Sequence, residues 1–210
     1  MQRSSRSLSM TVLRRLALTA LATAATALAG PQPYSIQPHS NAHFELRAYK
    51  TGLMSGKKHV FRFDRFEGRL AFDPEHVKDS SVAFTVDSDS IVCLDDWVGE
   101  KDRGKILDEA RGNMLAVKKF PQMRFESTSF EPAGADAYKV TGHLTIRDKT
   151  QDVTVSLKMH REGEALLFDG ESVVSLTDYG LKPPSAAFGM IGTKNEMDVS
   201  FALRAEPGKE

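Results

Sequence analysis

Apolar and polar residues alternate along much of the chain, as in a β-strand with one dry face and one wet face. Turn-forming residues, such as Asp73-Pro74 and the 148–151 segment, separate many of these stretches. The sequence therefore predicts an antiparallel β protein. The apolar positions of the predicted strands are Phe44 and Leu46; Phe61 and Phe63; Leu70 and Phe72; Val82, Phe84 and Val86; Met123 and Phe125; Tyr138, Val140, Leu144 and Ile146; Val153, Val155, Leu157 and Met159; and Met197, Val199, Phe201 and Leu203.

One stretch, residues 103–117, has the periodicity of a helix instead. Its apolar residues recur at intervals that place them on one helix face: Ile106, Leu107, Ala110, Met114 and Val117. Asp102 is suited to cap the N-terminus, and the lysines at 118–119 suit the C-terminus. We expect a single helix inserted into the series of strands, lying as a lid or plug.

About eight strands that are apolar on one face must bury that face together. An immunoglobulin-like sandwich is shorter, about 100 residues, and its antibody members pair two cysteines, whereas Cys93 is the only cysteine here. A barrel of about eight strands fits the length better, and such barrels are either filled by side chains or hold one small ligand. The pattern predicts a dry interior and leaves open whether that interior is packed or open.

The N-terminal 29 residues have the composition of a secretory signal peptide. They contain four arginines and no acidic residue, followed by a short apolar stretch that ends in Ala27-Leu28-Ala29. We expect cleavage after Ala29, which leaves one domain of residues 30–210 in the periplasm or outside the cell. The apolar stretch is shorter than the roughly 20 residues of a membrane-spanning helix, so no stable membrane insertion is expected.

Charge excludes one class of partner. The expected signal peptide takes four of the 28 basic residues and none of the 28 acidic ones, so the remaining chain has a net charge of −4. Binding to nucleic acid needs a basic face that neutralises phosphates, and the sequence shows none. Nucleic acid is therefore not an expected partner.

No residue pattern predicts catalysis or a metal site. Ser55 lacks the G-x-S-x-G spacing of a hydrolase nucleophile. His39 and His43 would lie roughly 13 Å apart in an extended segment, too far to share a metal ion. The chain is thus expected to have no catalytic residues and no metal, and an enzyme remains only as a site assembled by folding.

Three residues have both a structural and a functional interpretation. We interpret His59 as a surface or hydrogen-bonded histidine, and Cys93 as a small buried apolar residue rather than a reactive thiol. Trp97 stands in the acidic loop 95–100. It either gates the mouth of a cavity or, in the interpretation we favour, packs this loop against the barrel.

Five segments match the motifs of a known family, in the same order along the chain. They are Tyr34-Ser35-Ile36 with His39-Ser40 and Phe44; Phe66-Glu67-Gly68 followed by Phe72-Asp73-Pro74; FPQMRFEST at residues 120–128; GHLTIR at residues 142–147; and Tyr179-Gly180-Leu181. From about Tyr34 to Leu203 the chain resembles the YceI-like polyisoprenoid-binding proteins. It departs from a Gly-His-x-His step of one subgroup, because Gly56-Lys57-Lys58-His59 keeps only the second histidine.

The resemblance implies a lipocalin-like barrel of about eight strands whose interior holds a polyisoprenoid or an isoprenoid quinone, with no other cofactor. Together with the inward faces of the strands and the helix, it predicts eleven cavity-lining residues: Phe44, Phe61, Phe63, Phe84, Leu107, Met114, Phe125, Val140, Leu144, Val155 and Phe201. The alternative is a filled barrel that acts as an interaction or stress-response module, or as the partner of a membrane redox protein. The ligand's head group and the oligomeric state stay open.

Overall fold

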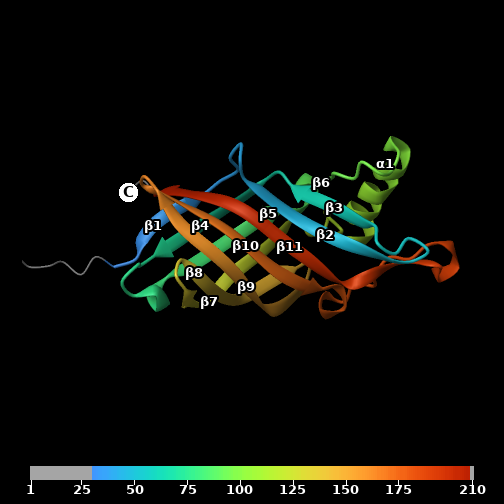
Figure 1. The fold of residues 1–210 in the computed structure, drawn as a ribbon. Helices are drawn as coiled ribbons and strands as arrows, with labels where there is room; N and C mark the ends of the chain where they lie inside the picture. The colour runs from blue at the N-terminus through green and yellow to red at the C-terminus, as the bar shows by residue number, and fades with distance from the viewer. Residues whose placement is uncertain (1–29, 209–210) are drawn as a thin grey trace, which may run out of the picture.

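A computed structural model describes residues 30–208 of the chain. The predicted signal peptide, residues 1–29, lies outside the described residues. In the described part, eleven strands form one continuous antiparallel sheet (Figure 1). The strands are β1 (Gln32–Ile36), β2 (His43–Gly52), β3 (Lys58–Phe63), β4 (Phe66–Phe72), β5 (Ser81–Asp87), β6 (Ile91–Cys93), β7 (Gln122–Gly134), β8 (Ala137–Ile146), β9 (Lys149–Glu162), β10 (Ala165–Ser175) and β11 (Ile191–Pro207).

Eight of these strands close into a barrel. Their order is β1-β4-β5-β7-β8-β9-β10-β11, and pairing of β1 with β11 completes the ring. The closing register places Tyr34 opposite Pro207 and Ile36 opposite Ala205. The predicted all-β fold, an antiparallel barrel of about eight strands with one inserted helix, is confirmed. Closure leaves no unpaired edge along the ring, which removes the usual site of edge-to-edge association.

The remaining strands extend the barrel wall beyond the ring. β11 has 17 residues. Its last residues pair with β1, while the earlier part, from Ile191 to Ala202, pairs with β2. β3 pairs with β2, and β6 pairs with β3. We call β2, β3 and β6 the extension. It lengthens one side of the barrel toward the helix (Figure 1).

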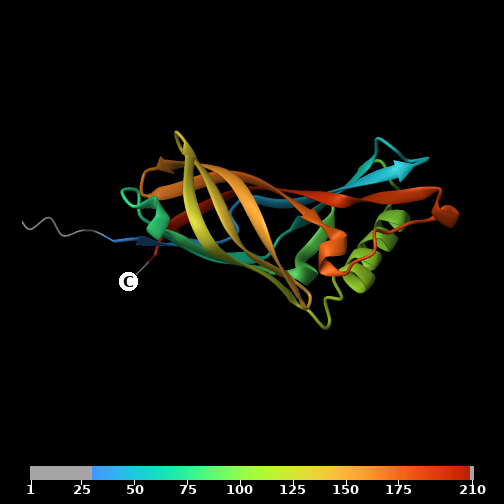
Figure 2. The same ribbon diagram turned by 90° about the horizontal axis from the view of Figure 1, so that it is seen from below.

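The helix lies at the end of the molecule away from the described chain termini (Figure 2). α1 (Glu100–Glu109) continues into a π-helical turn (Ala110–Met114). The predicted bounds, 103–117, are wrong at both ends. Gly99 is the N-cap, and Asp102 lies in the first turn and forms an ion pair with Lys105. An acidic side chain in the first turn also stabilises a helix through its dipole, so Asp102 marks the start without capping it.

Within the described residues, no helix has both the length and the apolar character needed to cross a membrane.

Short 3-10 helices shape the connections between strands. They are Val77–Asp79, Ser88–Ser90, Leu176–Tyr179 and Ala187–Gly189. Gly180 follows the third with a φ of 69°, and this left-handed residue lets the Leu181 N–H donate to the Leu176 carbonyl over 3.0 Å. Tyr179 is buried, and burial raises the pKa of its hydroxyl to about 12. The Tyr179-Gly180-Leu181 segment thus folds this turn back against the barrel.

A β-bulge in β7 changes which of its residues face inward. The register with β8 shifts between Ser127 and Ser129, so one extra residue stands on β7. Phe125 lies before the shift and Phe130 after it, and both face the interior although their positions differ by an odd number. Phe130 is 2% exposed and packs with Phe72 and Tyr138, at ring-centroid distances of 6.2 and 5.5 Å.

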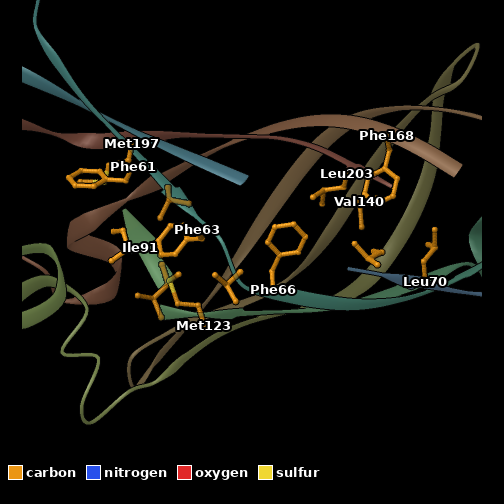
Figure 3. Packing of buried hydrophobic residues seen from close by; sticks show 14 of the residues in the cluster. Phe61, Phe63, Phe66, Leu70, Ile91, Met123, Val140, Phe168, Met197 and Leu203 are labelled. Atoms are coloured by element: carbon orange, nitrogen blue, oxygen red, sulfur yellow. The ribbon is translucent and has the colours of Figure 1, made fainter. Parts of the chain in front are cut away.

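The interior is apolar along its length. Buried side chains from facing walls point toward one another, including Phe63, Phe66, Val140 and Phe168 (Figure 3). Leu70 and Phe168 lie toward one end of the cluster, and Phe61 and Ile91 lie toward the other, where α1 is found (Figure 3). The dry interior predicted from alternation is therefore present.

Candidate ligand cavity

The barrel interior contains a cavity of about 570 Å³. All eleven described strands contribute to its wall, and α1 and the segment before β11 contribute at one end. Protein pockets for small molecules commonly measure about 300–1,000 Å³ and are mostly apolar. The size and character of this cavity are thus those of a ligand site.

Ten of the eleven residues predicted to line the cavity do line it: Phe44, Phe61, Phe63, Phe84, Met114, Phe125, Val140, Leu144, Val155 and Phe201. Leu107 does not. α1 presents Ile106 to the cavity and the π-helical turn presents Ala110 and Met114, while Leu107 packs against the buried core. The prediction for Leu107 fails because neighbouring residues of a helix point about 100° apart. Ile106 and Leu107 are both apolar, so spacing alone does not show which of the two faces the cavity.

The exposure of the aromatic rings shows where the interior is open. Phe44, Phe84, Phe125 and Phe201 line the cavity, yet each is only partly buried. Phe63, which also lines the cavity, is by contrast only 3% exposed. A fully packed core residue has neighbours on every side, so the accessible faces of the four rings border empty space.

Three glycines make room for three of these rings, and sequence reasoning missed them. Gly68 is paired with Phe84, and a Cβ at Gly68 would lie 2.8 Å from that ring. A Cβ at Gly142 would lie 2.6 Å from the Phe125 ring, and one at Gly170 would overlap the ring of Phe201. The rings thus lie over bare backbone instead of standing out into the cavity. A glycine inside a strand is a signal of such close approach.

The wall becomes polar at the end near α1. Lys50, His59 and Thr193 line the cavity there. His59 is buried, and its Nδ1 lies 2.5 Å from Oδ2 of Asp95, whose side chain is fully buried. The other oxygen of Asp95 accepts the Val60 N–H over 2.8 Å. The interpretation of His59 as a hydrogen-bonded histidine is confirmed.

Trp97 holds this corner together. Its indole N–H donates to the carbonyl of Lys58 over 3.0 Å, and its ring stacks on His59 at 5.3 Å between centroids. The loop that carries Trp97 therefore packs against the barrel, as predicted. Cys93 is buried, as predicted, and burial raises the pKa of its thiol.

One cluster in the described part of the chain has the composition of a metal site, and sequence reasoning did not identify it. The ligating atoms of Asp73, His76 and Asp79 lie within 4.8 Å of one another, in the connection between β4 and β5. The Asp73 carboxylate already accepts the backbone N–H groups of Glu75 and His76, each over 2.9 Å. These hydrogen bonds explain the cluster as part of a turn, and it does not border the cavity.

Comparison with known proteins finds relatives of this chain by sequence. Two UPF0312 proteins match: one from Pseudomonas putida is 29% identical over 130 residues, and one from Pseudomonas aeruginosa is 30% identical over 127. The matches cover 59% and 58% of this chain. They span 64% and 62% of the relatives, less than two thirds of their length.

Two solved structures have the same fold. Burkholderia cenocepacia BcnA has a TM-score of 0.60 at 24% identity, covering 77% of this chain and 95% of that one. The YCEI protein of Campylobacter jejuni has a TM-score of 0.56 at 15% identity, covering 71% and 85%. The sequence profile of the YceI-like domain matches residues 34–205, well over half of the chain. On this match, the chain belongs to the YceI-like family.

Proposed function

We propose that this chain is an exported binding protein that holds a long apolar ligand, an isoprenoid or isoprenoid quinone, inside the barrel and catalyses no reaction. The observation that carries the proposal is the apolar cavity of about 570 Å³. A filled barrel, the alternative, would leave no such space. Membership of the YceI-like family supports the same ligand class.

Burial of an apolar chain supplies the binding energy in this proposal. Each buried CH₂ contributes about 0.8 kcal/mol, so a five-carbon isoprene unit nominally contributes roughly 3–4 kcal/mol. Ordering a flexible chain in a narrow space offsets much of that gain. Selection among chains of different length then depends on the depth of the cavity, because the wall offers few polar contacts along most of its length.

The groups near the polar end of the cavity support binding rather than catalysis. Cys93 lies close to Asp95, the partner of His59, and a thiol beside such a pair suggests a nucleophile. Burial raises the pKa of Cys93, whereas a catalytic cysteine has a lowered pKa that favours the thiolate. The site therefore lacks an activated thiol.

Protein isolated from the periplasm of its native host tests the proposal. We expect its N-terminus to be Gly30 and its organic extract to contain about one long-chain lipid per protein chain, identified by mass spectrometry. Delipidated protein should melt at a higher temperature when isoprenoid is added, because a ligand that binds only the folded state stabilises it.

Two results would contradict the proposal separately. A chain found in the cytoplasm with Arg14 and Arg15 still attached would exclude export. Protein without lipid, whose melting temperature does not change on addition of isoprenoid, would exclude the carrier function and favour the interaction module.

A further inference from the structure

The inward face of the extension changes from apolar to polar along its length. On β2 this face carries Leu46, Ala48 and then Lys50, because side chains alternate along a strand. On β3 the residues opposite Leu46 and Ala48 are Phe61 and His59. Both strands therefore carry apolar side chains farther inside the barrel. Near α1 they present the ammonium of Lys50 and the imidazole of His59 to the cavity.

His59 is held in one orientation and has one ring nitrogen available. Asp95 occupies Nδ1, and Trp97 covers one face of the ring. A carboxylate only accepts hydrogen bonds, so Nδ1 carries the hydrogen of this pair, and Nε2 is the ring nitrogen left for another partner. In the described part of the chain, Nε2 has no hydrogen-bond partner.

Lys50 is the second unsatisfied polar group at this end of the cavity. Lys50 is only partly exposed, and its side-chain ammonium has no ion-pair or hydrogen-bond partner among residues 30–208. Burial lowers the pKa of Lys50, and the negative charge of Asp95 acts against that shift. A polar group beside an apolar cavity is stabilised by a hydrogen-bonding partner, and the wall supplies none.

We propose that Lys50 and His59 bind the head group of the apolar ligand, and that this head group is uncharged and presents hydroxyl or carbonyl oxygens. The Lys50 ammonium donates to a carbonyl or hydroxyl oxygen, and His59 Nε2 forms a hydrogen bond with a hydroxyl, which can donate or accept. The apolar chain then extends from this end into the barrel. The proposal rests on the proposed carrier function and adds the orientation of the ligand and the class of its head group.

The local charges favour an uncharged head group over a phosphate. One cation, Lys50, stands near one buried anion, Asp95. Phosphate sites usually offer several cationic or backbone donors. The other charged residues of the cavity wall have partners of their own: Lys105 with Asp102, Glu109 with Asn113 and Arg124 with Gln122.

Three probes with the same isoprenoid chain test the head group: farnesol, farnesyl phosphate and the hydrocarbon farnesene. Affinities are measured by calorimetry on delipidated protein. Trp97 is the single tryptophan of the chain and stacks on His59, so its fluorescence reports whether the head group reaches this end. We expect farnesol to bind about tenfold more tightly than farnesene, to change Trp97 emission, and to bind at least as tightly as farnesyl phosphate.

Lys50→Met should lower the affinity for farnesol about tenfold and leave that for farnesene unchanged. His59→Gln, whose amide still donates to Asp95, should weaken farnesol binding in the same way without exposing a buried unpaired charge. Lys158→Met, on the outer face of β9, is the matched control and should change neither affinity. Melting curves show whether each variant is folded.

The outcomes separate the two proposals. If the native chain binds all three probes equally and Lys50→Met has the same affinities, the head-group site is overturned and the carrier function is not. Tighter binding of farnesyl phosphate, lost in Lys50→Met, overturns the uncharged head group. Failure to bind any probe, farnesene included, overturns the carrier function together with the site.

A second, independent observation concerns the tips of two loops at the same end. Leu53, Phe188 and Met190, which we call the apolar tip, are 74%, 107% and 54% exposed. The Leu53 N–H donates to the Met190 carbonyl over 3.0 Å, so the loops are joined. Ala187 and Phe188 have φ angles of 50° and 55°, a costly backbone conformation for these residues. Burial in the core therefore does not explain the position of the Phe188 side chain.

Charge around the apolar tip has one sign. Residues 51–58 and 181–195 contain four lysines and no acidic residue, although the chain expected after cleavage is acidic overall. Exposed apolar side chains beside lysines match the interfacial and anionic regions of a bilayer surface. Ser185 and Ala186, which precede Phe188, line the cavity. We infer that the apolar tip docks this end of the barrel on a phospholipid surface that contains anionic lipid.

Co-sedimentation with vesicles tests the docking. We expect the chain to pellet with equal parts phosphatidylcholine and phosphatidylglycerol, more weakly with phosphatidylcholine alone, and less as salt is added. Leu53→Ser combined with Phe188→Ser should lower the bound fraction at least about fivefold. Val173→Ser, at an exposed valine on β10, is the control and should bind normally. Equal binding by the double variant, or no binding by the native chain, overturns the inference.

Discussion

Val155→Trp is expected to reduce the lipid that co-purifies with the protein to about a tenth of its normal amount or less, while the barrel stays folded. Val155 lies on β9 and lines the cavity, and it is only partly buried. An indole at this position extends into open space and occupies the path of the chain, so it competes with the ligand without displacing packed atoms. Lipid per mole of protein and a melting curve are measured on the same sample.

Two tryptophan variants serve as controls. Lys158→Trp places the same ring on the outer face of β9 and should leave lipid content unchanged. Val140→Trp lies opposite Val155, but Val140 is only 1% exposed, so the added bulk should destabilise the fold by about 1–3 kcal/mol. If Val155→Trp stays folded and keeps its full lipid content, the ligand does not pass this point.

Phe130→Ala is expected to lower the free energy of unfolding by about 3–5 kcal/mol, measured by denaturant titration. Phe130 is 2% exposed and packs against Phe72 and Tyr138 in the described structure. Removal of its ring leaves a cavity that the closed barrel cannot easily fill. The loss adds the cost of that cavity to the loss of buried apolar surface.

Phe125→Ala on the same strand is the matched comparison and should cost less, because Phe125 already borders open space. Lys158→Ala, on an outer face, should change the free energy of unfolding by less than about 0.5 kcal/mol. Equal losses for Phe130→Ala and Phe125→Ala would show that the cavity around Phe125 is closed in solution.

The sequence predicted the barrel because each strand has one buried face, and the side chains on that face recur at every second residue. Alternation follows the pleat directly, so Phe125, Val155 and Phe201 were placed correctly without any knowledge of their neighbours. Phe130 could not be placed in this way. A bulge shifts its position by one residue, and whether a strand contains a bulge depends on its partner, here β8.

The polar end of the cavity was beyond sequence reasoning for a related reason. Asp95 lies 36 residues from His59 and follows a strand of three residues, too short to show alternation. Lys50 continues the inward face of β2, but a lysine at the end of a strand is normally expected in solvent. Leu107 was misplaced because apolar spacing identifies a helix face only to within one residue when two neighbours are apolar.

The glycines beneath the cavity rings have a consequence for how the family diverges. Gly170 lies opposite Phe201, and any side chain at 170 would overlap that ring. A change at 170 therefore forces the ring into the lumen unless position 201 becomes smaller as well. Gly68 and Phe84 are coupled in the same way. Among relatives with an open barrel, residues 170 and 201 should change together, and so should residues 68 and 84. A relative that has lost the glycine but kept a bulky residue opposite it should have a closed barrel.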